Sequence, residues 1–478
     1  MNARTSEALA ATLTARQVDR KASASLVWQA LKVGAQIGQY IVLARLVAPD
    51  EFGIFALAAA VFAVLSAIND GGLSTAAVTS ARCDARLASN LWWTQVLLGT
   101  LAALIMAGST PLLSLLFGVP ALRDIGLWLA PALLISSLGL QSKATLRRDM
   151  HVGRLAFVDI AGIVLGLACA WVASRYTGGV ELLVICQLAT AVVTTCAACI
   201  LAPVRIGAFA PDTDYRRAVR TGWHVAGSDL LNVMRTHVPN LINGLFLALA
   251  DVGLFSRASQ LINLPLAVLS PAIGNFLLPL LSRSREQRAA YHAHLQRTQR
   301  LFLAAAIPLS VWLAMRPNEF IVLVLGSPWA PVVPVLQCLT PLFVSQIIST
   351  IARVSLLASE YSRVDRTFAI WNLALTAALV ACAAPFGVLA VALALSLSAV
   401  FLRAPLLVYF AIRHGCIGLH TLLDALRCIG VLAAFSAAAV ALARALPISA
   451  LRADLLSLFG CAAVTAVSLS TIVRKAGA

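Results

Sequence analysis

A positively charged side chain lies inside an apolar stretch near the start of the chain. Residues 28–40 read WQALKVGAQIGQY, with Lys32 among residues that suit a lipid bilayer. At about 100° per residue, a helix places Gln29, Lys32 and Gln36 on one polar stripe. A charge near the centre of a lipid-exposed helix costs at least about 2.5 to 3.5 kcal/mol. Lys32 therefore needs water, a counter-ion or a bound phosphate.

A second polar stripe follows in residues 222–247, where Asn232, Arg235 and Asn243 share one helical face. The planar guanidinium of an arginine holds a phosphate through two donors, and amide side chains donate to and accept from sugar hydroxyls. We expect a polar site that binds an anion, formed by Lys32, Arg235, Gln29, Gln36, Asn232 and Asn243. Arg257 is a weaker candidate, because a side chain near a helix end can equally extend to the membrane surface.

Two carboxylates accompany these cations and leave an alternative open. Asp70 and Asp229 lie in apolar or polar-striped spans, and carboxylates at such positions often carry coupled protons or cations. Equally, Asp70 and Asp229 can pair with Lys32 and Arg235 and only hold helices together. That second interpretation does not explain why so many amide side chains surround the charges.

The elements that position these residues are membrane helices. Hydrophobic residues make up 60% of the 478-residue chain and charged residues 12%, with a mean hydropathy of +0.89, whereas soluble chains carry about 25% charged residues. Runs of about 20 apolar residues, the length that crosses a bilayer, predict an all-α integral membrane protein with about 14 transmembrane helices. The first 22 residues do not resemble a cleaved signal peptide.

The distribution of arginine and lysine predicts the orientation. Basic residues concentrate in alternate loops, around 82–86, 143–154, 205–220, 283–300 and 363–366 and at Arg413. The opposite loops hold only single arginines. The positive-inside rule places the first set in the cytoplasm, together with both termini. The net charge of +16 therefore indicates a membrane protein rather than a nucleic-acid binder.

Known catalytic and metal-binding motifs are missing from the sequence. It contains no HExxH, no phosphate-binding loop and no nucleophile elbow. Cys196 and Cys199 form a CxxC inside an apolar run, where small-residue packing is the favoured interpretation. We expect no enzyme activity, no metal and no cofactor.

Two similar turns indicate an internal repeat. Residues 49–59 read PDEFGIFALAA and residues 250–260 read ADVGLFSRASQ, so that Gly53 aligns with Gly253. The following helices are predicted to break at Asn69, Gly71 and Gly72 in one copy and at Pro271 in the other, which are candidate hinges. The predicted organisation is a cytoplasmic segment 1–22, a six-helix bundle 23–201, a cytoplasmic linker 202–221, a second six-helix bundle 222–411, and two extra helices with a tail, 412–478. The repeat is parallel, which is typical of transporters.

The runs LARLVAPDEFGIFALAAAVFAVLSAINDGGLSTAAV at 43–78 and LQSKATLRRDMHVGRLAFVDIAG at 140–162 resemble the bacterial polysaccharide transporters. These are oligosaccharide flippases of the multidrug/oligosaccharidyl-lipid/polysaccharide exporter superfamily. The resemblance implies two six-helix bundles around a cavity that opens alternately to either side of the bacterial inner membrane. It also implies a substrate, an oligosaccharide on a polyprenyl pyrophosphate, flipped from the inner to the outer leaflet for lipopolysaccharide or exopolysaccharide synthesis.

The partners that we expect are the polyprenyl-linked oligosaccharide and membrane lipids, with a polysaccharide polymerase and chain-length proteins as further candidates. No nucleic acid is expected, and one copy of the chain is expected to suffice. Three alternatives remain: a flippase for lipid II, the peptidoglycan precursor; a multidrug/cation antiporter, which favours acidic rather than basic residues in its cavity; and a membrane glycan polymerase or ligase. The short outer loops count against the last class.

Overall fold

The computed structural model describes residues 27–80, 84–285, 287–359, 361–445, 456–457, 459–468 and 470. These residues form helices and short connections and contain no β-strand. Ten of the described helices have the length and apolar composition needed to cross a membrane. The chain is therefore a multi-pass, all-helical membrane protein, as its composition predicts.

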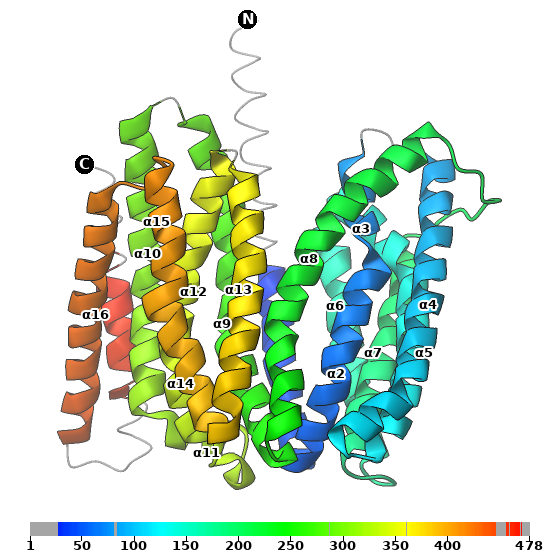
Figure 1. The fold of residues 1–478 in the computed structure, drawn as a ribbon, viewed down its shortest axis with the longest axis horizontal. Helices are drawn as coiled ribbons and strands as arrows, with labels where there is room; N and C mark the ends of the chain where they lie inside the picture. Colours follow the sequence, from blue (N-terminus) through cyan, green and yellow to red (C-terminus); the bar gives the residue numbers. More distant parts are fainter. Residues whose placement is uncertain are drawn as a thin grey trace, which may run out of the picture. The chain divides into compact units, whose positions relative to one another are not determined.

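The helices follow one another with short connections (Figure 1). Their bounds are 27–46, α2 (Pro49–Asp70), α3 (Leu73–Thr79), α4 (Ala85–Phe117), α5 (Ala121–Arg148), α6 (Val152–Ala173), α7 (Val180–Leu201), α8 (Thr213–Phe246), α9 (Leu249–Arg283), α10 (Arg288–Met315), α11 (Pro317–Val324), η1 (Ser327–Trp329), α12 (Val332–Ala358), α13 (Ser362–Ala383), η2 (Ala384–Phe386), α14 (Val388–Ser398), η3 (Ala399–Arg403), α15 (Ala404–Arg413) and α16 (Leu419–Ala445).

The helices form two compact units. Unit 1 contains the described residues up to Val47 together with Val61–Val233, and unit 2 contains Ala48–Ala60 and the described residues from Met234 onward. The division falls inside α2 and α8, so each of these helices contributes to both units. The predicted domain boundaries, which place a linker at 202–221, therefore remain a prediction. Residues 203–212 within that range are not helical, and α8 begins at Thr213.

In unit 1, α4 packs along α5, and α7 packs against both α5 and α6. The connection before α8 is fixed to the start of α4 by Asn90, whose side chain donates to the Ala210 carbonyl at 2.8 Å and accepts from the Ala210 amide at 2.9 Å. In unit 2, α12 packs against α9 and α10, and α10 packs against α16. The last of these contacts joins α16, the first of the two predicted extra helices, to the rest of the unit.

The two similar turns lie against each other within unit 2. A Cβ added at Gly53 would lie 1.9 Å from the Leu249 carbonyl oxygen, and one added at Gly253 would lie 2.1 Å from the Pro49 carbonyl oxygen. Each glycine therefore allows the backbone of the other turn to approach. The repeated sequence is explained by this reciprocal contact, which no larger residue would permit.

The two predicted helix breaks behave differently. Gly71 and Gly72, with φ values of 53° and 66°, form a left-handed turn between α2 and α3, a conformation that glycine adopts without strain. Buried Asn69 fixes the end of α2 by donating to the Leu133 carbonyl at 3.1 Å. The break predicted at Pro271 is wrong, because α9 continues through this residue. A proline removes only one helical hydrogen bond, and packed membrane helices tolerate that loss.

Candidate functional site

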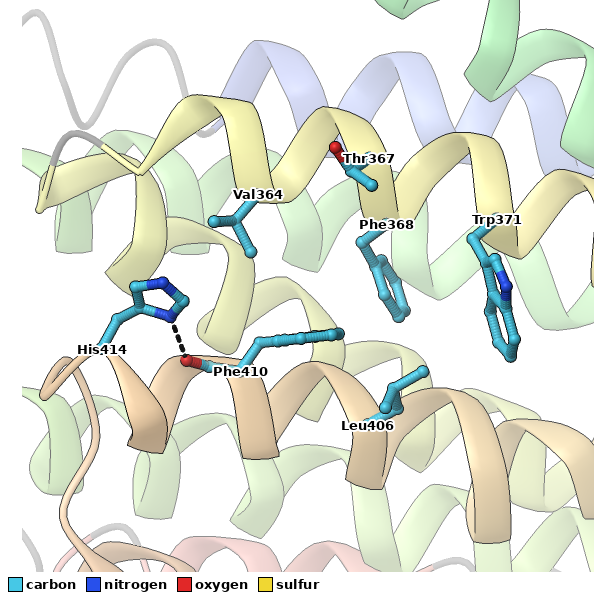
Figure 2. Close-up of a pocket in the computed structure, with 7 residues that line it drawn as sticks. All are labelled: Val364, Thr367, Phe368, Trp371, Leu406, Phe410 and His414. Carbon is cyan, nitrogen blue, oxygen red and sulfur yellow. Dashed lines mark hydrogen bonds between the residues drawn. The ribbon is translucent and has the colours of Figure 1, made fainter.

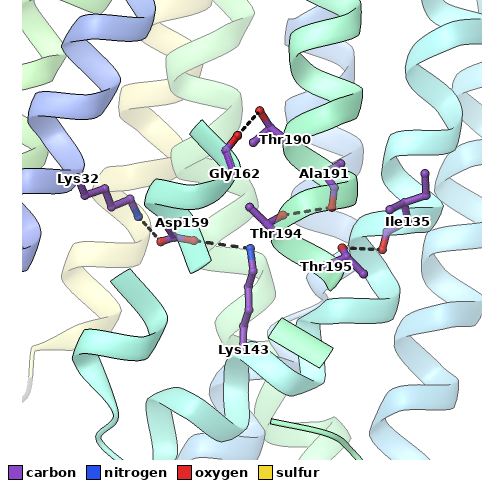
Figure 3. Close-up of polar contacts among 9 residues, drawn as sticks. All are labelled: Lys32, Ile135, Lys143, Asp159, Gly162, Thr190, Ala191, Thr194 and Thr195. Atoms are coloured by element: carbon purple, nitrogen blue, oxygen red, sulfur yellow. Dashed lines mark hydrogen bonds and ion pairs between the residues drawn. The ribbon is translucent and has the colours of Figure 1, made fainter. Parts of the chain in front are cut away.

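Two lysines of unit 1 meet at one carboxylate, and the three side chains come from three helices (Figure 3). Lys32 Nζ lies 2.6 Å from Asp159 Oδ2, and Lys143 Nζ lies 3.6 Å from Asp159 Oδ1. Lys32 comes from helix 27–46, Lys143 from α5 and Asp159 from α6. We call these three residues the lysine–aspartate cluster.

Small residues hold α6 close to α7 and so fix Asp159. A Cβ at Gly162 would lie 2.2 Å from Thr194 Cγ2, and a Cβ at Gly166 would lie 2.1 Å from Thr190 Oγ1. Thr190 also donates to the Gly162 carbonyl at 3.2 Å. Two glycines four residues apart thus let the helices approach closely, as is common in membrane bundles.

The same helix α7 is fixed to α5, which carries Lys143. Thr195 Oγ1 donates to the Ile135 carbonyl of α5 at 3.0 Å. Helix 27–46 is attached to α7 as well, because Gln39 Nε2 donates to Cys186 Sγ at 3.1 Å. The cluster therefore rests on helices that are locked together by short side-chain contacts (Figure 3).

The charges of the cluster do not cancel. Two ammonium groups face one carboxylate, which leaves one positive charge in excess. The side chains of Lys32, Asp159 and Lys143 remain 29%, 21% and 22% exposed, so a ligand can reach them. Such an arrangement can exchange the internal carboxylate for a phosphate oxygen without leaving a lysine unpaired.

The structure places Asp159, rather than Asp70 or Asp229, against Lys32. Asp70 accepts a hydrogen bond from Ser74 instead, and Asp229 is exposed. The two carboxylates are close enough to interact electrostatically with each other. In the described part of the chain neither takes part in an ion pair, so their predicted role in ion coupling remains a prediction.

In unit 2, Arg235 lies within electrostatic range of two other arginines, and we call these three residues the arginine cluster. Arg235 of α8 interacts with Arg353 of α12 and with Arg403 of η3. Arg353 forms a two-pronged ion pair with Asp365, at 2.8 and 3.2 Å. Among the described residues, no carboxylate pairs with Arg235, so the cluster holds three positive charges and one negative charge.

Arg403 is the least exposed member of the arginine cluster, at 7%. Its guanidinium donates to the Leu395 carbonyl and, at 3.3 Å, to Thr376 Oγ1 of α13. The Leu395 carbonyl lies one helical turn before the π-helical segment η3, where the backbone pattern changes. Arg403 therefore attaches the distorted segment of this span to α13.

The remaining predicted binding residues are distributed differently. Asn243 is fully buried, and its amide atoms have no hydrogen-bond partner among the described residues. Asn232, Gln29 and Gln36 are half-buried on their helices. Their predicted role in sugar binding remains a prediction.

Arg257 occupies a packing position rather than an open one. It is 4% exposed, its guanidinium carbon lies 3.6 Å from the Phe52 ring centre and 5.6 Å from that of Trp329, and it donates to Gln260 at 2.9 Å. Stacking of this kind is a common use of a buried arginine. The geometry favours a role at the contact between the two similar turns.

The comparisons with known proteins agree on the family. Residues 42–334 match the family described as "Polysaccharide biosynthesis protein". The lipopolysaccharide biosynthesis protein WzxC of Escherichia coli is 19% identical over 317 residues, covering 64% of this chain and 63% of that protein. The succinoglycan biosynthesis transport protein ExoT of Rhizobium meliloti is 22% identical over 333 residues, covering 69% and 66%. These alignments span less than two thirds of the relatives' length.

Solved structures show the same fold. A structure of the lipid II flippase MurJ in an inward closed conformation matches with a TM-score of 0.78 and 14% identity, covering 96% of this chain and 99% of that one. An inward-facing multidrug resistance MATE family transporter of the MOP superfamily matches with a TM-score of 0.64 and 14% identity, covering 81% and 94%. At this identity the likeness concerns the fold alone.

Proposed function

The chain belongs to the polysaccharide biosynthesis protein family, and from this premise we propose that it is a flippase for polyprenyl-pyrophosphate-linked oligosaccharides. It moves the lipid-linked sugar from the inner to the outer leaflet of the bacterial cytoplasmic membrane, with both termini in the cytoplasm, by alternating access. The names of the relatives, which concern polysaccharide synthesis and transport, support this class of substrate.

The observation that carries the proposal is the charge of the arginine cluster. A buried or half-buried cation without a counter-ion is costly in a membrane, and the described residues provide Arg235 with arginine neighbours but no carboxylate. A pyrophosphate removes this cost, because it supplies several negative oxygens that a planar guanidinium binds through two donors. An antiporter for organic cations would not favour such a site.

The lysine–aspartate cluster supports the same substrate class. Its excess positive charge attracts an anion, and Asp159 keeps Lys32 and Lys143 paired while no substrate is bound. In the proposed cycle, the phosphate displaces Asp159 from the lysines, and the return of the carboxylate assists release. The internal carboxylate thus prevents the anion from binding too tightly for turnover.

The polar amides supply contacts for the sugars. Gln29 and Gln36 flank Lys32 on helix 27–46, and Asn232 and Asn243 flank Arg235 on α8. Amide side chains pair with hydroxyl groups both as donors and as acceptors. Asp70 and Asp229 are proposed to carry the coupled proton or cation, because their mutual repulsion is relieved by binding one.

The remaining parts of the proposal follow from transport rather than catalysis. We expect no enzyme activity, and the relatives are named as biosynthesis or transport proteins. A polysaccharide polymerase and chain-length proteins are proposed partners that receive the flipped substrate, and one copy of the chain is proposed to suffice. The runner-up is a lipid II flippase, which would handle the same pyrophosphate with a different sugar.

The test compares the native host with and without this protein. Lipid-linked glycan is labelled in intact cells with a membrane-impermeant, sugar-directed reagent, and peptidoglycan precursor is followed in parallel. The proposal predicts that deletion traps the polysaccharide precursor in the inner leaflet while lipid II remains normally distributed. Trapping of lipid II instead favours the runner-up, and normal distribution of both contradicts a flippase function.

A further inference from the structure

A groove lined almost entirely by apolar side chains lies between α13 and α15 (Figure 2). Its volume is about 500 Å³, within the range of small-ligand sites of about 300 to 1,000 Å³. The side chains that line it come from both helices: Val364, Thr367, Phe368, Trp371, Leu406, Phe410 and His414. None of them belongs to the lysine–aspartate or arginine clusters.

The two helices that form the groove share a neighbour. Both α13 and α15 pack on α12, and α13 also packs on α14 and η2. Between α14 and α15 the chain passes through the π-helical segment η3, and insertions of this kind occur at many functional sites. Arg403 donates a hydrogen bond to Thr376 and so attaches η3 to α13. Trp371, five residues before Thr376 on α13, lines the groove.

The walls of the groove are flat and aromatic. Phe368 and Trp371 project from α13, and Phe410 projects from α15 toward them (Figure 2). Trp371 remains 48% exposed, although Phe368 is 7% exposed, so the groove has a buried floor and an open edge. Rigid rings offer a large apolar surface at little cost in side-chain entropy, which suits a methyl-branched hydrocarbon chain.

One end of the groove is polar and basic. His414 Nδ1 donates to the Phe410 carbonyl at 2.8 Å, and its ring lies 4.5 Å from that of Tyr361. Exposed Arg366 lies near the start of α13, and exposed Arg413 lies in the last turn of α15. The basic loops at this end place it at the cytoplasmic leaflet by the positive-inside rule. An anionic head group would find complementary charge here.

We propose that this groove binds the polyprenyl chain of the lipid-linked substrate, with the phosphate toward Arg366 and Arg413. This inference rests on the proposed function, because it assigns the lipid portion of the same substrate to a separate site. An apolar groove with a basic end holds the substrate in the leaflet where it originates, and the sugar and pyrophosphate engage the polar helices in a later step.

The test uses the purified full-length protein in nanodiscs and a polyprenyl phosphate that carries a photoreactive group along its chain. The expected result is covalent labelling of the segments around Trp371 and Phe410. An excess of unlabelled polyprenyl phosphate suppresses the labelling, and the same amount of phosphatidylglycerol does not. Labelling that phosphatidylglycerol suppresses equally well identifies an ordinary lipid-facing surface and overturns the proposal.

Variants of the groove residues test whether the polyprenyl chain binds in the groove itself. Trp371→Ala and Leu406→Trp, which widen and fill the groove, are each expected to lower labelling about five- to tenfold, the loss that accompanies removal or exclusion of one apolar contact surface. Phe401→Ala is the matched control, because Phe401 is an aromatic residue of η3 that is 74% exposed and does not line the groove. Equal losses in all three variants contradict a specific site.

The labelling test and the test of the proposed function can give different results, because labelling of the groove does not require transport. A wild-type protein that labels in the groove but does not flip the glycolipid overturns the proposed function alone. A wild-type protein that flips the glycolipid but shows no competitive labelling in the groove overturns the present inference alone. Unchanged thermal unfolding of the variants excludes loss of fold as the cause.

Discussion

The Nζ atom of Lys32 lies 2.6 Å from Oδ2 of Asp159, a residue 127 positions away in the sequence, and Lys143 approaches the other oxygen of the same carboxylate at 3.6 Å. The pair explains how a lysine is accommodated in an apolar span. It also implies a competition, because an incoming phosphate must replace the carboxylate. The strength of the internal pair therefore sets a balance between binding and release.

The first prediction concerns this balance. Asp159→Asn leaves Lys32 and Lys143 without their internal anion, so we expect about tenfold tighter binding of a polyprenyl pyrophosphate, equivalent to about 1.4 kcal/mol, together with slower transport. Binding is measured by titration in detergent and transport in liposomes. Asp149→Asn, an exposed aspartate at the end of α5, is the control. Weaker binding in Asp159→Asn would show that Asp159 only stabilises the helices.

The second prediction concerns Arg235. Arg235→Ala removes the guanidinium that lacks a described carboxylate partner, so we expect transport to fall about ten- to a hundredfold, since a charge-assisted hydrogen bond contributes about 1.5 to 3 kcal/mol. Arg235→Lys keeps the charge but loses the planar fork and should give an intermediate rate. Arg220→Ala alters an exposed cation of the same helix and should transport normally. Full activity in Arg235→Ala would exclude this residue from the site.

A third prediction follows from the two similar turns. Gly53→Ala would place a Cβ 1.9 Å from the Leu249 carbonyl oxygen. The two turns must move apart to remove this clash, and such overpacking lowers the free energy of unfolding by about 1 to 3 kcal/mol. We expect the thermal midpoint in detergent to fall by several degrees. Gly108→Ala is the control, because nothing lies within 4 Å of its added Cβ and alanine favours the helix. Equal thermal midpoints for the two variants would mean that the contact between the turns does not stabilise the protein.

A fourth prediction concerns the attachment of α16. Arg300 of α10 donates to both oxygens of Asp424 of α16, at 2.6 and 2.7 Å. A double-mutant cycle of Arg300→Ala and Asp424→Ala should give a coupling of about 1 kcal/mol, typical of a well-formed but partly exposed pair. The exposed pair Arg217–Asp214, at 3.8 Å, should give almost none. Similar coupling in both pairs would contradict a specific contact between α10 and α16.

The sequence predicted correctly those features that depend on a local pattern of residues. Hydropathy predicted the helices, and the resemblance predicted a family that the comparisons confirm. The aligned glycines of the two turns, Gly53 and Gly253, marked residues that contact each other's backbone. Each of these signals depends on neighbouring residues or on a repeated motif, both of which are visible in one chain.

The partners of the charged residues were not predictable in the same way. Asp159 is a lone carboxylate in the apolar run of α6, a signal of the kind that singled out Lys32, but nothing in the sequence connects the two. Lys143 was assigned to a basic loop because Arg147 and Arg148 follow it, whereas α5 continues to Arg148. Which residues meet depends on the rotation of each helix, and helix rotation is set by contacts such as those of Gly162 with Thr194.

The interruption of two helices was also not predicted correctly from the sequence. Pro271 predicted a break, but α9 is continuous, because the cost of one missing hydrogen bond is small beside the packing of a 35-residue helix. Conversely, the π-helical segment ends at Arg403, two residues before Pro405, a proline that we did not identify as a helix interruption. The buried contacts of Arg403, which only the fold reveals, accompany this distortion.

The most direct test of the central claim is transport by the purified protein. Liposomes containing the protein and a fluorescent polyprenyl-pyrophosphate oligosaccharide are treated with an impermeant quencher, and the protected fraction is followed over time. The account predicts that the wild-type protein makes the inner-leaflet glycolipid accessible, that Arg235→Ala does so much more slowly, and that Arg220→Ala matches the wild type. A wild-type rate equal to that of protein-free liposomes would contradict the account.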